Sequence, residues 1–278
     1  MKTLIALLLL VPAGLCAADE IRVAGSPIVQ PPVSEAVKTL RKENGLEVEI
    51  SVSGGTEGGL YALANGNAKL VMMAREVQPQ DRAAYPGVLL TQVKLCRQVA
   101  ALCVSADIWN SGIHQLNPDQ VRGIYEGRTK NWKELGGPDE KITFFNWEEG
   151  FGMWELLATW LYESTNRAPK GMFTAVASNE EARNAVEFTK GSIGVMSPKM
   201  AAGGSVYSLS LNMNGQVVEP SVKNVASGDY LMSRQMVMAF DDRPTGSAKV
   251  IVDYLLSPAG QECFSKRGFF TATELEGR

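Results

Sequence analysis

Apolar residues recur along the chain with two different periods. Residues 21–24 form a short apolar run typical of a strand. In residues 33–40 the apolar positions lie three and four apart, which is the spacing of one helix face, and Gly45 follows where that helix is expected to end. Residues 46–52 then alternate between apolar and polar, the period of a strand with one buried face. The chain therefore opens with a β-α-β unit.

The same alternation of strands and helices continues to the C-terminus. Further strands are predicted at residues 68–73, 99–104, 142–145, 192–196 and 235–240, and further helices at residues 153–161 and 248–255. Asn117 followed by Pro118 marks a helix start, because asparagine caps a helix and proline suits its first turn. Ser178 with Glu181 is typical of a capping box. Strands alternating with helices favour an α/β fold with mostly parallel sheets covered on both faces.

The first residues have the pattern of an export signal. Lys2 precedes an apolar run at residues 4–11, and small residues follow at Ala17 and Ala18. The run is shorter than the roughly 20 residues that a membrane-spanning helix needs. We therefore expect residues 1–18 to be a signal peptide, so that the mature, periplasmic chain begins at Ala18 or Asp19.

Cys16 leaves an alternative in which the protein is a lipoprotein anchored through this cysteine. Leu15 is larger than the small residue that usually precedes such a cysteine, which favours the unlipidated form. Removal of the signal takes Lys2 away and changes the formal net charge from -3 to -4. Nucleic-acid binding requires a concentrated basic patch, so this mildly acidic chain is not expected to bind nucleic acid.

The sequence offers little for catalysis, and we expect no enzyme, no metal and no cofactor. His114 is the only histidine, which excludes a zinc cluster built from several histidines and argues against a catalytic triad. We place it in a surface loop. Cys96, Cys103 and Cys263 remain after signal removal. Two alternatives stay open for them: one disulfide with a cysteine left over, or three buried thiols.

Two strand-to-helix turns are candidates for ligand binding. Residues 53–59 contain four glycines and Thr56, and such a turn can bring backbone N–H groups close to an anion. The alternative is a tight turn that holds no ligand. In the second turn, residues 148–152, Glu148 and Glu149 suggest the acid and base of a hydrolase. Adjacent residues in a turn usually point apart, so a solvated loop or a favourable helix start is the preferred interpretation.

Several segments, in their order and spacing, resemble PstS-type phosphate-binding proteins. The sequence N-P-D-Q-V-R-G-I-Y-E-G at residues 117–127, followed by N-W-K-E-L-G-G at residues 131–137, is similar to the second lobe of that family. Residues 191–195 (G-S-I-G-V) resemble a strand of the family, residues 227–234 its Y-P-L-S-R segment, and residues 268–270 its closing G-F turn.

The resemblance implies a two-lobed periplasmic binding protein fold of type II, with two crossover strands joining the lobes. Lobe one would be residues 19–103 and 233–278, and lobe two residues 104–232. Such a protein is a monomer that captures a small anionic solute, phosphate or another, by hinge closure and delivers it to an ABC permease in the inner membrane.

Transferred onto this chain, the resemblance implies the ligand-binding residues Ser26, Ile28, Thr56, Arg75, Trp147 and Gly152. The set departs from the family in both lobes. Pro27 stands where the family has a threonine, and Ala74 where it has a serine. In lobe two, Trp147, Phe151 and Met153 replace an arginine, a serine and a threonine.

These departures predict weak or no phosphate binding, because Glu148 and Glu149 would lie beside the anion without the arginine. A complementary ligand would have an acidic end facing Ser26, Thr56 and Arg75 and an apolar or cationic end facing lobe two. The alternative is a diverged sensory or protein-interaction relative that binds no small ligand. Its cleft would be empty, and Arg75 would pair with Glu148 or Glu149.

Overall fold

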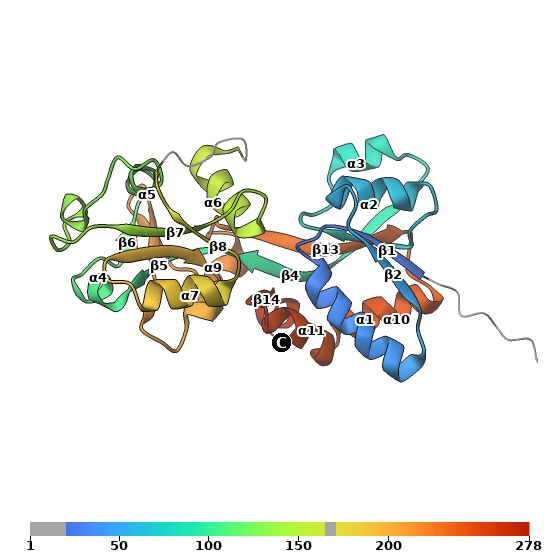
Figure 1. Ribbon diagram of the computed structural model, residues 1–278. Coiled ribbons are helices and arrows are strands. Elements are labelled where there is room, and N and C mark those ends of the chain that lie inside the picture. Colours follow the sequence, from blue (N-terminus) through green and yellow to red (C-terminus); the bar gives the residue numbers. More distant parts are fainter. Residues whose placement is uncertain (1–20, 165–170, 278) are drawn as a thin grey trace, which may run out of the picture.

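The structure is a computed structural model of the 278-residue chain, and it describes residues 21–164 and 171–277. The predicted signal peptide, its cleavage site and Cys16 lie outside these residues. Over the described ranges, none of the helices has the length and apolar character required to cross a membrane. The chain forms two α/β lobes that lie side by side and are joined by long strands (Figure 1).

Lobe one is built on a six-stranded sheet in the order β14-β4-β13-β3-β1-β2. Its strands are β1 (Ile21–Gly25), β2 (Val48–Ser51), β3 (Leu70–Met73), β4 (Leu90–Val99), β13 (Ser233–Asp241) and β14 (Phe270–Thr271). Its helices are α1 (Gln30–Asn44), α2 (Gly55–Ala64), α3 (Pro79–Ala84), α10 (Gly246–Leu256) and α11 (Pro258–Ser265). Helices α2 and α3 cover one face of the sheet and α1 and α10 the other, so the sheet separates two apolar cores (Figure 1).

Lobe two is built on a five-stranded sheet in the order β10-β5-β9-β7-β8, with a small sheet in the order β12-β11-β6 beside it. The strands are β5 (Ala101–Ser105), β6 (Gln115–Leu116), β7 (Thr143–Trp147), β8 (Thr174–Val176), β9 (Ser192–Met196), β10 (Val206–Ser208), β11 (Ser210–Met213) and β12 (Gln216–Val218). The helices are α4 (Ala106–Asn110), α5 (Pro118–Tyr125), the 3₁₀ helix η1 (Trp132–Leu135), α6 (Gly152–Tyr162), α7 (Asn179–Glu187), α8 (Pro198–Ala201) and α9 (Val222–Ser227).

Strands β4 and β13 cross between the lobes as an antiparallel pair. Strand β4 runs through Ala100 directly into β5 of the second sheet, and Ala100 N–H donates to Met232 just before β13. The change of sheet on the outward path thus falls near Ala100, whereas the sequence-based division has its boundary at residue 103, inside β5.

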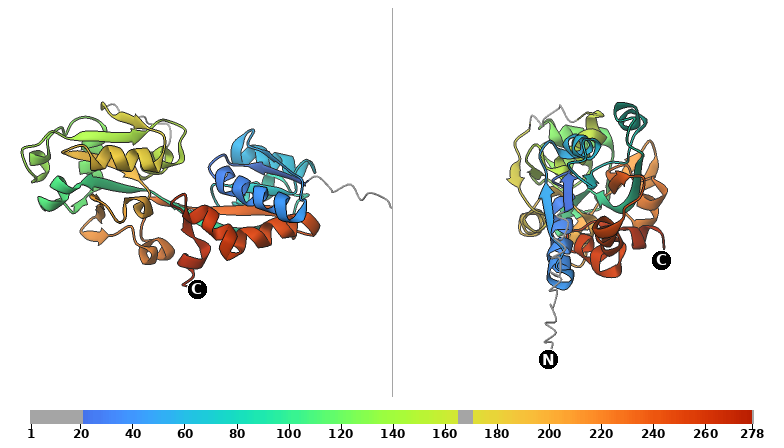
Figure 2. Two further views of the ribbon diagram at one scale, coloured as in Figure 1. Left: turned by 60° about the horizontal axis from the view of Figure 1, so that its bottom comes forward. Right: turned by 90° about the vertical axis from the view of Figure 1, so that its right-hand side faces the viewer.

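The C-terminal segment is a third connection between the lobes. Strand β14 pairs with β4, and α12 (Ala272–Leu275) packs against α9 of lobe two. Phe270 belongs to the apolar core of lobe two. Lys199 of lobe two reinforces this contact, because its Nζ lies 2.8 Å from a carboxylate oxygen of Glu274. The chain end therefore contacts both lobes (Figure 2), whereas the division from sequence placed all of residues 233–278 in lobe one.

Both sheets are mixed, which differs from the expectation of mostly parallel sheets. Parallel pairing holds for β1 with β2 and β3, and for β7 with β8 and β9. The pairs that involve β4, β13 or β5 are antiparallel. The reason is the crossover: a strand that leaves a lobe and one that returns to it run in opposite directions.

The helix boundaries follow the capping residues that the sequence predicts. Asn117 caps α5, with its side chain accepting from Gln120 N–H at 2.9 Å. Ser178 caps α7 by accepting from Glu181 N–H at 3.0 Å, and the Glu181 carboxylate accepts from Ala177 N–H, one residue earlier than in a regular capping box. These caps start the helices on either side of the lobe-two sheet.

The cysteines and the histidine have structural environments. Cys96, Cys103 and Cys263 are all buried and free, so the thiol alternative holds over the described residues and the disulfide does not. Burial raises the pKa of Cys103 to about 12, which keeps this thiol protonated and unreactive. His114 is exposed in the loop before β6, as expected, and its ring lies 4.2 Å from that of Trp109.

Candidate functional site

The cleft between the lobes contains two adjoining cavities. The α1-side cavity has a volume of about 720 Å³, and its lining includes Ile28, Pro31, Gln98, Trp147, Phe151 and Phe269. The α2-side cavity has a volume of about 940 Å³, and its lining includes Ser26, Thr56, Arg75, Glu155, Trp160 and Arg234. Pro27, Ile28 and Gly150 line both cavities. All six residues that the sequence proposes as ligand-binding therefore line one cavity or the other.

The turn from β1 into α1 uses its polar groups internally. Ser26 is buried, its N–H donates to Met72 O at 2.7 Å, and its hydroxyl accepts from Ile28 N–H at 3.3 Å. Gly25 has a φ of 126°, and a Cβ there would lie 2.1 Å from Met72 O. The groups proposed to bind an anion at Ser26 and Ile28 thus stabilise the turn itself.

Prolines reduce the number of donors at the start of α1. Pro31 and Pro32 lie in the first turn of the helix, and Pro27 precedes it. Proline is tolerated at a helix start because that N–H has no partner within the helix. The same unpaired N–H groups are what make a helix start attractive to an anion. Three proline residues in six positions therefore leave this helix start a poor anion site.

The glycine-rich turn at residues 53–59 serves close packing of α2 on β1. A Cβ on Gly59 would lie 2.8 Å from the Gly25 Cα, so only glycine allows the helix to approach the strand this closely. Gly54 has a φ of 71°, which favours glycine before the helix. Thr56 is buried, and its hydroxyl accepts from Ala74 N–H at 3.4 Å. Packing accounts for these features without a bound anion.

Arg75 is neutralised within lobe one. Its two terminal nitrogens lie 2.6 and 2.9 Å from the two carboxylate oxygens of Asp81, a fork-to-fork pair. One of them also lies 3.0 Å from a Glu57 oxygen. Arg75 holds the pKa of the buried Asp81 below its usual value of 3.8 through this hydrogen bond. The suggested pairing of Arg75 with Glu148 or Glu149 is wrong, because Asp81 and Glu57 lie on its own lobe and within reach.

On the lobe-two side, an indole stands where the family has an arginine. Trp147 is buried at the end of β7, and its Nε1 donates to Val195 O at 2.7 Å. Its ring centroid lies 5.6 Å from that of Phe151, whose side chain is 39% exposed. Trp147 with Phe151 and Met153 therefore gives this wall of the cleft an apolar surface and no positive charge.

Arg234 is a cleft residue that the sequence analysis missed. It begins the return crossover on β13, and its Nε donates to Gln98 Oε1 at 3.0 Å on the neighbouring strand β4. A second nitrogen lies 2.6 Å from a Glu155 oxygen on α6, and the third lies 3.3 Å from Gly152 O. Arg234 thus joins the crossover strands to lobe two.

Gly152 is required by this arrangement. A Cβ at Gly152 would lie 2.5 Å from an Arg234 nitrogen and 2.9 Å from the Gln98 amide. The start of α6 therefore packs directly on the crossover strands. The sequence signal that could have identified Arg234 was its place beside Ser233 in the segment between the lobes. A positive charge in such a segment needs a carboxylate partner.

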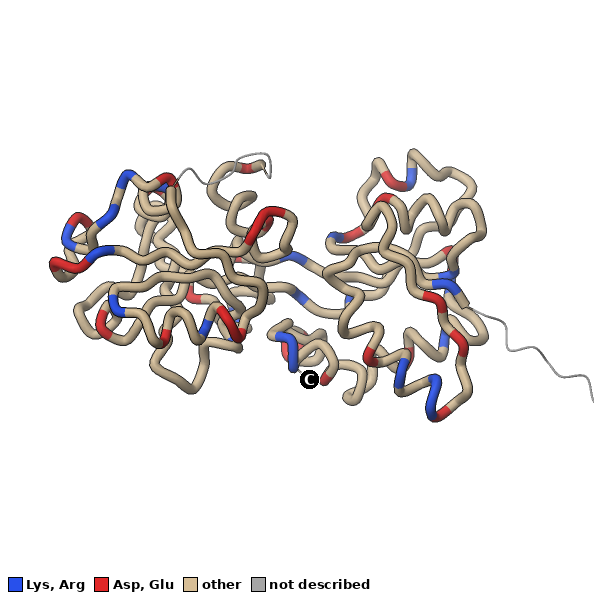
Figure 3. Tube along the Cα trace, in the orientation of Figure 1, with Lys and Arg blue, Asp and Glu red and all other residues tan. Residues whose placement is uncertain are grey.

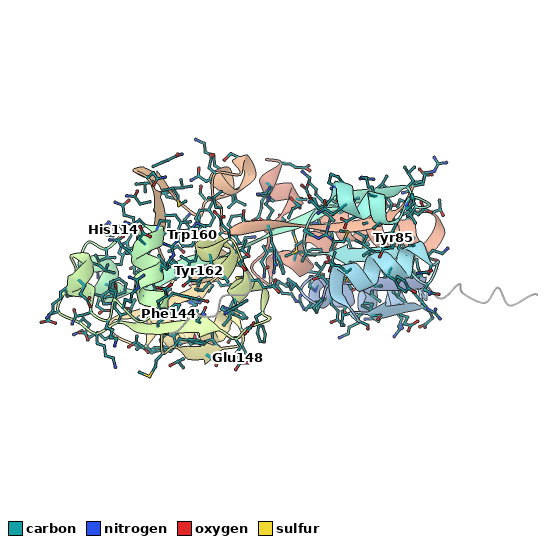
Figure 4. The ribbon with its side chains drawn as sticks, turned by 90° about the horizontal axis from the view of Figure 1, so that it is seen from above. Tyr85, His114, Phe144, Glu148, Trp160 and Tyr162 are labelled. Carbon is teal, nitrogen blue, oxygen red and sulfur yellow. The ribbon has the colours of Figure 1, made fainter. Side chains whose placement is uncertain are left out.

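The surface charge of the two lobes is mixed. Over the described residues, basic and acidic segments are interspersed along both lobes (Figure 3). In the view from above, Tyr85 lies in lobe one, and Glu148 and Trp160 lie in lobe two (Figure 4).

Two α/β lobes, crossover strands between them and a cleft lined from both sides define the class of two-lobed periplasmic binding proteins. The chain belongs to the PBP superfamily, because the model of the PBP superfamily domain matches residues 11–259. It is similar to the phosphate-binding protein PstS of Bacillus subtilis, with 26% identity over 262 residues that cover 94% of this chain and 83% of the relative. Its sequence is thus PstS-like over most of its length.

Solved structures support the fold. An ABC-type phosphate transport receptor from Vibrio cholerae has a TM-score of 0.72 and 20% identity, with 91% of this chain and 99% of the receptor covered. PstS from Borrelia burgdorferi has a TM-score of 0.67 and 21% identity, with coverages of 90% and 98%. The expectation that the chain is not an enzyme agrees with its curated PstS relatives, which are named as binding proteins.

Proposed function

We propose that the protein is exported and serves as the solute-binding component of an ABC uptake system. The observation that carries this proposal is the cleft, whose two cavities are lined from both lobes. A solute held there gains contacts from both sides when the lobes close, and closure about a hinge is a common response to a ligand. The closed form then docks on an ABC permease in the inner membrane.

The ligand is proposed to differ from that of the PstS relatives. The Ile28 N–H is used locally, the Ser26 and Thr56 hydroxyls accept local hydrogen bonds and keep one O–H donor each, Arg75 is paired with two carboxylates, and Trp147 brings no charge. A phosphate in this cleft would lose its water without receiving enough charged hydrogen bonds in return. The protein is therefore expected to bind phosphate weakly or not at all.

Export is a separate part of the proposal. Residues 1–18 are taken as a signal peptide, and the protein purified from the periplasm of an expressing bacterium should begin at Ala18 or Asp19. N-terminal sequencing measures this directly. A chain that retains Met1 would rule out export by this signal, and an acylated Cys16 at the N-terminus would establish the lipoprotein alternative.

A second function, binding another protein without a small ligand, is favoured by one observation. Both arginines that line the α2-side cavity, Arg75 and Arg234, are held in ion pairs. Thermal unfolding of the purified protein with phosphate, sulfate, small organic anions, amines and amino acids separates the two functions. A solute-binding protein gives a saturable rise in melting temperature with at least one compound, since a ligand of the native state stabilises it by mass action. A blank result across the panel supports the second function.

A further inference from the structure

The α1-side cavity has an apolar wall contributed by both lobes. Trp147, Met153 and Phe269 are buried at its edge, and Phe151 is partly exposed to it. Ile28 and Pro31 face them from lobe one. A volume of about 720 Å³ lies within the range of roughly 300–1,000 Å³ that is usual for small-molecule sites. Such a wall suits a flat apolar group such as an aromatic ring.

Among the described residues at this cavity, the carboxylates without an ion pair outnumber the cations without one. Arg267 is the cation among the described lining residues, and its guanidinium already pairs with Glu35. Through this hydrogen bond, Arg267 lowers the pKa of Glu35. Glu149 and Glu180 also line the cavity, and over residues 21–164 and 171–277 neither carboxylate forms an ion pair. A bound cation would therefore find two carboxylates, whereas a bound anion would find its cation occupied.

The side-chain amide oxygens of Asn179 and Gln98 at the cavity are already engaged. Asn179 accepts from Ser197 N–H at 2.9 Å and donates to Arg267 O at 3.5 Å. Gln98 accepts from Arg234 at 3.0 Å. Among the described lining residues, the charged groups without an ion pair are therefore the two carboxylates, and the Gln98 amide nitrogen remains as a neutral donor.

We propose that the α1-side cavity binds a small organic solute with an aromatic or other apolar body and a cationic amine end, an inference that rests on the proposed solute-binding function. The apolar body packs against Trp147, Phe151 and Phe269, and the amine faces Glu149 and Glu180. Both carboxylates are exposed at the rim of the cavity, so they favour a cationic ligand over an anionic one mainly through the sign of their charge.

The competing explanation for the carboxylates is helix stabilisation. Glu180 lies in the first turn of α7, and Glu149 precedes α6, where negative charge is favourable without any ligand. This explanation predicts that replacing the two carboxylates lowers the free energy of unfolding and leaves the ratio of amine to carboxylic acid affinity unchanged. The two explanations therefore differ in a binding measurement.

The test uses 2-phenylethylamine and 3-phenylpropionate, which share a ring and a two-carbon chain and differ in the sign of their charge. Titration calorimetry on the protein expressed as the full chain should give an affinity about tenfold or more in favour of the amine. The double variant Glu149→Gln with Glu180→Gln should remove that preference. Glu148→Gln is the matched control, because Glu148 is adjacent in sequence and outside the described lining of the cavity.

A second variant covers the case in which the double variant does not fold. Phe151→Ala removes a ring that is 39% exposed and should weaken amine binding by about tenfold. Phe188→Ala removes a ring that is 83% exposed and lies outside the described lining, and should leave amine binding unchanged.

Tighter binding of 3-phenylpropionate, or an amine affinity unchanged in the carboxylate and Phe151 variants, would overturn the inference. Absence of amine binding would overturn it as well. If another compound of the thermal panel binds in that case, only the ligand class is wrong and the proposed solute-binding function stands. If no compound of the panel binds, both fail.

Discussion

The α2-side and α1-side cavities adjoin and share three lining residues, yet their charged groups have different roles. On the α2 side, Arg75 and Arg234 each hold a carboxylate at 2.6 Å, one within lobe one and one across to lobe two. On the α1 side, the walls are apolar and two carboxylates lack ion pairs over the described residues. The comparison teaches that the net charge a ligand meets in a cavity depends on which of the charged lining residues are already paired within the protein.

The largest expected effect concerns the glycine that positions the α2-side wall. Gly25→Ala should destabilise the protein by about 3 kcal/mol or more, because it combines an unfavourable φ with a clash against backbone. Gly45→Ala is the matched control: its φ is also positive, at 65°, but a Cβ there has open space. It should cost about 1–2 kcal/mol. If urea unfolding gives the same loss of unfolding free energy for both variants, close packing at Gly25 does not stabilise this side of the cleft.

A smaller effect is expected for the ion pair that joins the crossover to lobe two. Arg234→Ala removes hydrogen bonds to Gln98 and Glu155 and should lower the free energy of unfolding by about 2 kcal/mol. Arg243→Ala is the control, because its side chain is 83% exposed and should change stability by less than about 0.5 kcal/mol. An equal change in the free energy of unfolding for both variants would mean that the Arg234 contacts do not stabilise the fold.

The smallest effect is a pH dependence in the α2-side cavity. The folded protein holds the pKa of Asp81 below 3.8, so the pair with Arg75 stabilises the fold above that pH. The contribution should be lost as the pH falls below 3.8 and through the lower pKa of the folded state. Urea midpoints measured between pH 7 and pH 3 should therefore fall less steeply for Asp81→Asn than for the native protein.

The sequence predicted the periodic elements of the fold but not the crossover strand β4. Helices α1, α5, α6, α7 and α10 lie near the predicted residues because an apolar face marks α1, α6 and α10 and a capping residue marks the start of α5 and α7. Strand β4 passes between the lobes and carries exposed Lys94 beside buried Leu95 and Cys96, so it lacks a regular period. The direction of pairing was also missed, since it depends on the path of the chain between lobes.

The sequence located the site but did not give the partners of its residues. Resemblance placed Ser26, Thr56 and Arg75 at the cleft, and the cavities include all three. The pairing of Arg75 with Asp81 depends on the orientation of α3 against β3, which no spacing in the sequence specifies. The role of Arg234 was missed for the same reason, because Glu155 is 79 residues away in the chain.

The most direct test of the account is titration calorimetry of the mature protein with inorganic phosphate at neutral pH. The account holds that the charged donors of the cleft, Arg75 and Arg234, are paired within the protein, and each charged hydrogen bond that is missing costs a phosphate about 1.5–3 kcal/mol of binding free energy. It therefore predicts no measurable binding heat, or a Kd far weaker than micromolar. A sub-micromolar Kd would contradict it.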